Sequence, residues 1–132
     1  MSGPAPGARP AEVLVVSPQG IEAQTRLIAE EAPISLEFNG LAYAVMMATP
    51  TDLEDFAVGF ALSEGAVARA DEIRALNLSC GELGWFVRMD IAAERMAPIV
   101  ERARRRVADG GCGLCGVENL EQAMRTPRAA QP

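Results

Sequence analysis

An Asn39-Gly40 dipeptide between two alternating apolar runs constrains this chain more than any other feature. Apolar and polar residues alternate from Ile34 to Phe38, and apolar residues recur at every second position from Leu41 to Val45. Asn and Gly both tolerate the positive φ angles of a tight hairpin turn. The sequence therefore predicts an antiparallel β-hairpin whose register is set by this turn.

The residues after the hairpin predict a helix. Thr49-Pro50 ends the sheet pattern, and Thr51 to Glu54 matches a capping box, in which the threonine caps the helix and the glutamate reaches back. The apolar residues from Leu53 to Ala61 have helical spacing, and Gly65 suits the helix C-terminus. Gly59 lies inside this helix, and we expect it to allow close packing against the hairpin.

Several shorter patterns complete the predicted fold. We expect further strands over 11–17, 26–29, 75–80 and 85–91, a turn or short helix over 70–74, a helix over 93–107 that Pro98 kinks or delays, and a short helix over 117–125. This is an α+β chain with a small mixed sheet, an N-terminal hairpin and two or three helices. We expect residues 1–10 and 126–132 to be disordered tails on one domain spanning 11–125.

Composition excludes several classes of function. The chain has 132 residues and contains no histidine and no lysine, so all 12 basic residues are arginine. Histidine-based triads and metal motifs are excluded, as is lysine-amine chemistry. The net charge of −6 argues against nucleic-acid binding. Neither a secretory signal nor a membrane-spanning run is present, which predicts a cytoplasmic protein whose thiols stay reduced.

The segment 110–116 carries the chemistry in this sequence. It has the sequence Gly-Gly-Cys-Gly-Leu-Cys-Gly and places two thiols, Cys112 and Cys115, three positions apart among flexible glycines. Four hypotheses fit this spacing: a carrier of persulfide sulfur, a redox pair, half of a zinc site completed by another chain, and two inert structural cysteines. The spacing does not separate sulfur carriage from redox work.

Charged neighbours bear on the reactivity of these thiols. Arginines gather just upstream, at 102, 104, 105 and 106, and with a helix starting near Val117 they would favour the thiolate. Asp109 and Glu118 oppose this effect. The arginines fit either a solvated helix face or a docking patch for an acidic partner or anionic cofactor. We expect Cys80, at a strand end, to pack either in the core or near the surface.

Four stretches in order resemble the FdhD family, the sulfurtransferases needed for formate dehydrogenase maturation. They are Glu31 to Leu36 with Asn39-Gly40, Met46 to Glu54, Ala57 to Gly65, and Gly111 to Gly116. The resemblance runs from about Glu30 to Arg125. Family members continue into a second half with a deaminase-like fold and conserved histidine segments. This chain has no histidine, so it resembles the N-terminal half.

The resemblance implies a function that spacing alone does not give. Family members accept sulfur from a cysteine desulfurase as a cysteine persulfide and pass it to the molybdenum cofactor, in its bis-guanine-dinucleotide form, before that cofactor enters formate dehydrogenase. Carried over, Cys112 is the expected persulfide site and Cys115 the second thiol. No metal or covalently bound cofactor is expected, and the cofactor-binding half has no counterpart here.

Two alternatives remain beside the sulfur carrier. One is a zinc- or partner-binding half-module without sulfur transfer, and the other is an inactive truncated fragment. The expected partners are a cysteine desulfurase and formate dehydrogenase with its molybdenum cofactor. We expect binding to neither nucleic acid nor a membrane. A homodimer remains open.

Overall fold

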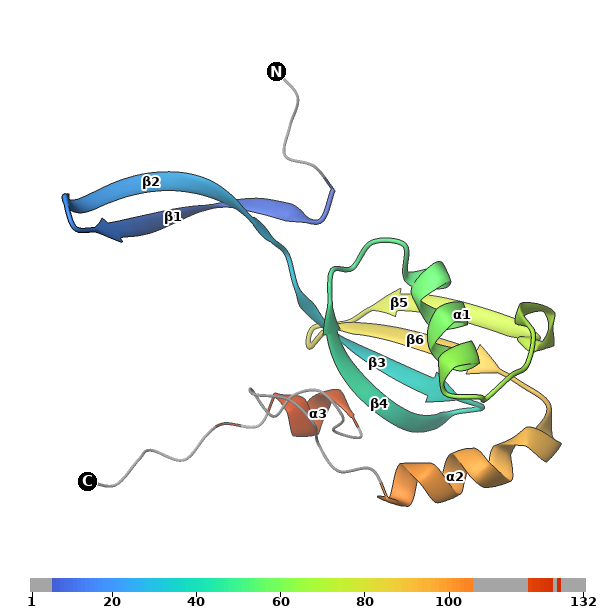
Figure 1. The fold of residues 1–132 in the computed structure, drawn as a ribbon. Helices are drawn as coiled ribbons and strands as arrows, with labels where there is room; N and C mark the ends of the chain where they lie inside the picture. The colour runs from blue at the N-terminus through green and yellow to red at the C-terminus, as the bar shows by residue number, and fades with distance from the viewer. Residues whose placement is uncertain (1–5, 106–118, 125, 127–132) are drawn as a thin grey trace.

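The computed structural model describes residues 6–105, 119–124 and 126. The described chain forms a mixed four-stranded sheet with helices around it and a separate two-stranded arm (Figure 1). The strands are β1 (Ala8–Ser17), β2 (Gly20–Ala29), β3 (Ala32–Phe38), β4 (Leu41–Ala48), β5 (Ala75–Cys80) and β6 (Trp85–Asp90). The helices are α1 (Leu53–Ser63), α2 (Met96–Arg105) and α3 (Leu120–Ala123), with short 3₁₀ turns η1 (Ala70–Glu72) and η2 (Ala93–Arg95). The α+β class with a mixed sheet is confirmed.

The main sheet has the strand order β4-β3-β6-β5. β3 pairs antiparallel with β4, its neighbour in sequence, and parallel with the distant β6, and β5 pairs antiparallel with β6. Two hairpins, β3–β4 and β5–β6, are therefore joined by one parallel contact along the centre of the sheet.

The predicted hairpin turn at Asn39-Gly40 is confirmed. Both residues have positive φ, 49° and 79°, as a turn matched to the twist of the strands requires. Asn39 also holds the end of β6: its side chain accepts a hydrogen bond from the Ile91 N–H at 2.8 Å and donates one to the Ile91 carbonyl at 3.0 Å. The turn that sets the β3–β4 register thus also fixes where β6 ends.

The two faces of the sheet are covered differently. On one face, α1 and part of α2 enclose the main core, in which Leu36, Phe38, Val87 and Met89 are fully buried. On the other face, the short α3 packs against Val45 and Phe86 through its first and last residues, Leu120 and Ala123. Ser35 lies between Val45 and Phe86 in the register and is buried, so a small side chain lies under α3.

Helix α1 differs from the sequence prediction in two ways. The predicted capping box is wrong, because Asp52, in the left-handed region with φ 52°, is the N-cap and makes no side-chain cap bond. The Phe56 N–H instead donates to the Asp52 carbonyl at 3.0 Å. Close packing of Gly59 is also wrong: the residue is exposed, and an added Cβ would meet nothing within 4 Å. Gly65, with φ 67°, ends the helix as predicted.

The β5–β6 hairpin matches its predicted strands. Its loop closes with a 2.8 Å hydrogen bond from the Gly81 N–H to the Gly84 carbonyl. Gly84 has φ 151°, and a Cβ at this position would lie 2.3 Å from the Pro33 carbonyl oxygen. Glycine is therefore required where this loop passes the first residues of β3.

The arm is longer than the sequence patterns indicated. The predicted strands 11–17 and 26–29 are parts of β1 and β2, which pair antiparallel from Ala8 opposite Ala29 to Ser17 opposite Gly20. Residues 8–10, expected to be disordered, belong to β1, and residues 1–5 lie outside the described chain. The arm extends away from the main sheet in Figure 1.

The helices after β6 begin later than predicted, and residues 106–107, 117–118 and 125 of the predicted ranges lie outside the described residues. The pattern over 93–107 becomes η2 followed by α2, which begins at Met96, so Pro98 lies in the first turn where a missing N–H is tolerated. The pattern over 117–125 becomes α3, from Leu120 to Ala123. Within the residues that the structure describes, no helix has the length and apolar character needed to cross a membrane.

Candidate functional site

The predicted reactive cysteines, Cys112 and Cys115, lie outside the described residues, within 106–118. The structure does describe the two segments that this loop connects, namely the end of α2 and residue Asn119 before α3. The candidate site is therefore built from these two anchors and from the contacts that position them.

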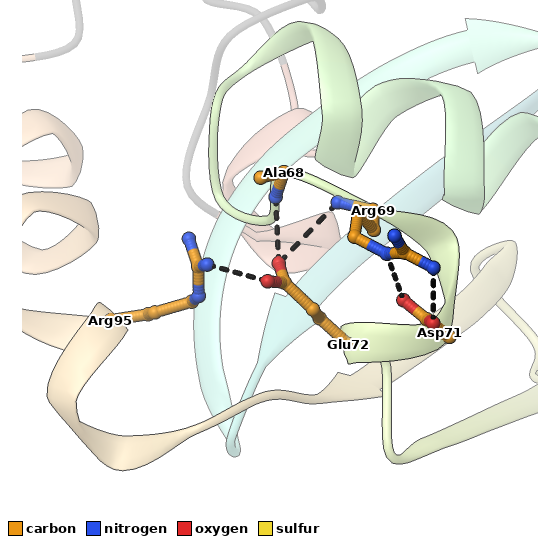
Figure 2. Close-up of polar contacts among 5 residues, drawn as sticks. All are labelled: Ala68, Arg69, Asp71, Glu72 and Arg95. Carbon is orange, nitrogen blue, oxygen red and sulfur yellow. Dashed lines mark hydrogen bonds and ion pairs between the residues drawn. The ribbon is translucent and has the colours of Figure 1, made fainter.

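The start of α2 is fixed by a carboxylate cluster around Glu72, shown in Figure 2. The Glu72 carboxylate accepts hydrogen bonds from the backbone N–H groups of Ala68 at 2.7 Å and Arg69 at 3.4 Å. Arg95, in the turn that leads into α2, donates to the other carboxylate oxygen at 2.7 Å. One side chain thus ties the loop after α1 to the residue that precedes α2.

These contacts shift two ionisation equilibria. The pKa of Glu72 is lowered, first by the backbone hydrogen bond from Ala68 and also by Arg69 and Arg95, because each contact favours the carboxylate. The pKa of Arg69 is raised, chiefly by its hydrogen bonds to Asp71 at 2.9 and 3.0 Å. Both residues are charged at neutral pH, so the cluster stays closed.

The middle of α2 is held by a second contact with α1. Arg102 donates a hydrogen bond to the backbone carbonyl of Glu64, the C-cap residue of α1. The Glu64 carboxylate accepts a 2.6 Å hydrogen bond from the Tyr43 hydroxyl of β4. Ile99, fully buried, adds an apolar contact from α2 to the core. The last turn of α2 is therefore placed by contacts to α1 and β4.

Arg102 shows that the predicted arginine cluster is not a uniform surface. Arg102 and Arg104 are both exposed, but Arg102 also donates a hydrogen bond to the backbone at the end of α1. The side chain of Arg105 and all of Arg106 lie outside the described residues. From the sequence, the cluster as a whole was expected to be either a solvated face or a docking patch. Both alternatives overlooked the structural role of Arg102.

A hollow of about 270 Å³ lies between the two anchors of the cysteine loop. Its wall comes from the start of β4, from α2 and from the residue before α3: Leu41, Ala42, Val100, Ala103, Arg104 and Asn119. Arg104 precedes the 106–118 segment in the sequence, Asn119 follows it, and both residues line this hollow. Sequence analysis gave no sign of it, because its residues come from separate elements.

Cys80 is exposed, so of the two positions expected for it the core is wrong. It ends β5, the edge strand of the main sheet. Its Sγ lies 3.8 Å from the Gly81 carbonyl oxygen. Among the residues that the structure describes, no group of three or more acidic or cysteine side chains is placed to hold a metal ion.

The comparison with family models decides the family. The model of the FdhD/NarQ family matches residues 29–132. The chain belongs to the FdhD/NarQ family. The match includes the cysteine loop and both of its anchors, and it begins at the last residue of β2, so nearly all of the arm precedes it.

Curated relatives agree with this assignment. The sulfur carrier protein FdhD of Cupriavidus necator is 49% identical over 100 residues, which cover 76% of this chain and 35% of that protein. The sulfur carrier protein FdhD of Xanthomonas oryzae pv. oryzae is 44% identical over 101 residues, which cover 76% of this chain and 36% of that protein. This FdhD/NarQ chain therefore spans about a third of the length of the curated relatives it matches.

A solved structure supports the fold. The crystal structure of a protein proposed to be a formate dehydrogenase accessory protein, from Desulfotalea psychrophila, superposes with a TM-score of 0.55 at 25% identity. The superposition covers 66% of this chain and 35% of that one. The fold described here is thus found in part of a larger solved chain.

Proposed function

We propose that this chain is a sulfur carrier for formate dehydrogenase, with Cys112 as the persulfide site and Cys115 as the second thiol. The observation that carries the proposal is the family match over 29–132, which includes both cysteines. The similar curated proteins are named sulfur carrier proteins. In this proposal a cysteine desulfurase is the donor, and the molybdenum cofactor, as bis-MGD, is the acceptor before its insertion into formate dehydrogenase.

The loading step is a thiol exchange. The Cys112 thiolate attacks the outer sulfur of the persulfide on the desulfurase cysteine, a new S–S bond forms on Cys112, and the desulfurase cysteine leaves as a thiolate. Atoms and electrons balance without an added oxidant or reductant. The sulfane sulfur is then carried on Cys112 and is the group handed to the cofactor, which is a substrate of the carrier.

The described anchors support this role for the loop. α2 is held by Arg95 and Arg102, and Leu120 of α3 is buried against the sheet, so both ends of the loop start from fixed positions. The glycines at 110, 111, 113 and 116 give the backbone between these anchors freedom to present a thiol to two partners in turn. Arg104, which lines the hollow and precedes the loop in the sequence, is one of the arginines that we expect to favour the thiolate.

The proposal is tested by transferring sulfur to the chain with its cysteines reduced, as we expect them to be in the cytoplasm. Cysteine desulfurase and cysteine are added to the purified chain, and the intact mass is measured without reductant. We expect a gain of one sulfur atom, which disappears in Cys112→Ala. Cys80→Ala is the matched control, because Cys80 is an exposed thiol outside the loop, and it should load like the unchanged chain. Undiminished loading of Cys112→Ala would contradict the proposal.

A further inference from the structure

The hollow at the start of β4 has an apolar floor. Its four apolar side chains are all half-buried and surround a space of about 270 Å³: Leu41, Ala42, Val100 and Ala103. β4 is an edge strand of the main sheet and α2 runs beside it (Figure 1), so the floor lies between a sheet edge and a helix. A concave apolar surface of this kind accepts an inserted side chain, because contact removes both apolar surfaces from water.

The rim of the hollow carries a positive charge. Arg104 is exposed, and it has no hydrogen-bond or ion-pair partner among residues 6–105 and 119–124. Arg102, one turn of thought away in the same helix, differs because it donates to the Glu64 carbonyl. A carboxylate placed opposite Arg104 would form a charge-assisted, two-pronged contact with its guanidinium. The hollow therefore suits a group that is apolar at one end and acidic at the other.

This composition favours a peptide over a nucleotide cofactor. A dinucleotide cofactor carries several phosphates, and binding them usually takes more than one cation. The described wall offers one arginine and four apolar side chains. A leucine or phenylalanine next to an aspartate or glutamate matches both the floor and the rim, so the chemistry of the wall fits a segment of another protein.

The hollow is close to the cysteines along the chain. Arg104 and Asn119, which precede and follow the 106–118 segment, both line it. Cys115 is the fourth residue before Asn119, so the Cα atoms of these two residues lie within about 14 Å of each other in any conformation. A protein bound in the hollow is therefore held near a thiol of the loop.

We propose that this hollow is the docking site of the sulfur-donor protein, which inserts a bulky apolar side chain flanked by a carboxylate. The inference rests on the sulfur-carrier function proposed above and adds the surface that the sulfur donor recognises. Docking turns an exchange between two separate thiols into an exchange within one complex, which raises the effective concentration of the reacting sulfur atoms. A small persulfide in solution reacts without this contact.

Two sulfur donors separate docking from thiol reactivity. Cysteine desulfurase with cysteine is the protein donor. Glutathione persulfide is the small donor: the Cys112 thiolate takes its outer sulfur, and glutathione leaves as a thiolate. Loading is followed by intact mass over time. A change in the thiolate fraction alters the rate with both donors, whereas lost docking raises only the carrier concentration that gives half-maximal loading by the desulfurase.

Charge reversal at the rim has the largest expected effect. We expect Arg104→Glu to raise the half-maximal carrier concentration for the desulfurase about tenfold or more, because two carboxylates then face each other. Arg104→Lys keeps the charge and should stay within about threefold of the unchanged chain. Arg9→Glu is the matched control, because Arg9 is an exposed arginine on the arm, and it should have no effect.

A smaller side chain tests the apolar floor. Val100→Ala removes two methyl groups from the hollow, and we expect it to raise the same half-maximal concentration about fivefold. Val13→Ala, at another half-buried valine in β1, is the matched control and should leave this concentration unchanged. Thermal melts show that each variant is folded. A folded Val100→Ala chain with an unchanged half-maximal concentration would contradict the floor contact.

Direct binding tests docking without sulfur transfer. With Cys112 and Cys115 changed to serine, titration calorimetry measures the dissociation constant for the desulfurase, and adding Arg104→Glu should raise it about tenfold. Equal binding with and without Arg104→Glu, or equal slowing with both sulfur donors, would overturn the docking site and leave sulfur carriage intact. Failure of both sulfur donors to load the unchanged chain would contradict the proposed function and the docking site with it.

Discussion

The arm and the body of this chain use the same strand pattern with opposite results. In β3, apolar residues at alternate positions are fully buried, as Leu36 and Phe38 show. In β1, Leu14 and Val16 alternate in the same way and are 70% and 74% exposed. Alternation therefore sets which face of a strand is apolar, whereas burial depends on whether another element covers that face.

The family comparison follows the same division. The FdhD/NarQ match covers the body from residue 29 onward, including the two helices that enclose its core. The exposed apolar face belongs to the region before that residue. The matched part of the chain thus has helices over its core, whereas the described residues leave the apolar face of the arm exposed.

The sharpest test of this contrast removes one apolar side chain from each region. Phe38→Ala should lower the free energy of unfolding by about 3–5 kcal/mol, because the ring is fully buried and packs edge-on against Tyr43 at 5.4 Å between centroids. Leu14→Ala should change it by less than about 0.5 kcal/mol, because the side chain is 70% exposed. Urea unfolding followed by circular dichroism measures both. Equal losses of unfolding free energy in the two variants would contradict the contrast between the buried body and the exposed arm.

A second test adds a methyl group to an exposed part of the body. Gly59→Ala should raise the free energy of unfolding by about 0.5–1 kcal/mol, because the new Cβ meets nothing and alanine favours a helix. Gly84→Ala is the matched control, and it should destabilise the chain because its Cβ would collide with the Pro33 carbonyl. Thermal melts compare the two variants. A loss of stability in Gly59→Ala would mean that the outer face of α1 is covered.

The smallest expected effect concerns the polar surface of the body. The folded-state pKa of Glu72 is lowered, so its contacts contribute stability above the pKa of an unfolded glutamate, and this contribution is lost as pH falls through the folded-state pKa. The melting temperature of Glu72→Gln should therefore lie below that of the unchanged chain at neutral pH, and the gap should narrow in acid. Glu94→Gln, a neighbouring change outside this cluster, should show no such trend. A gap that is independent of pH would contradict this assignment.

Local signals in the sequence predicted local structure well. Asn39-Gly40 fixed the hairpin, and Gly65 marked the end of α1, because each needs only a few adjacent residues in a restricted conformation. The capping box at Thr51 failed, since Asp52 adopts a left-handed conformation and becomes the cap instead. Gly59 was misjudged although the helical spacing from Leu53 to Ala61 places it away from the apolar face, and the structure leaves it exposed.

Contacts between distant segments were not predictable in the same way. Nothing in the sequence of β3 indicated that β6 would be its second neighbour, or that Arg102 would bind the end of α1. The hollow beside Arg104 likewise requires three elements to be placed first. Cys112 and Cys115 were identified from spacing and family resemblance, lie outside the described residues, and stay a prediction.

The parallel pairing of β3 with β6 has a consequence during synthesis of the protein. Ile34 pairs with Trp85, so the central strand leaves the ribosome long before its second neighbour exists. Until β6 arrives, the nascent chain exposes one side of β3 together with its apolar residues. Closure of this long-range contact should set the folding rate.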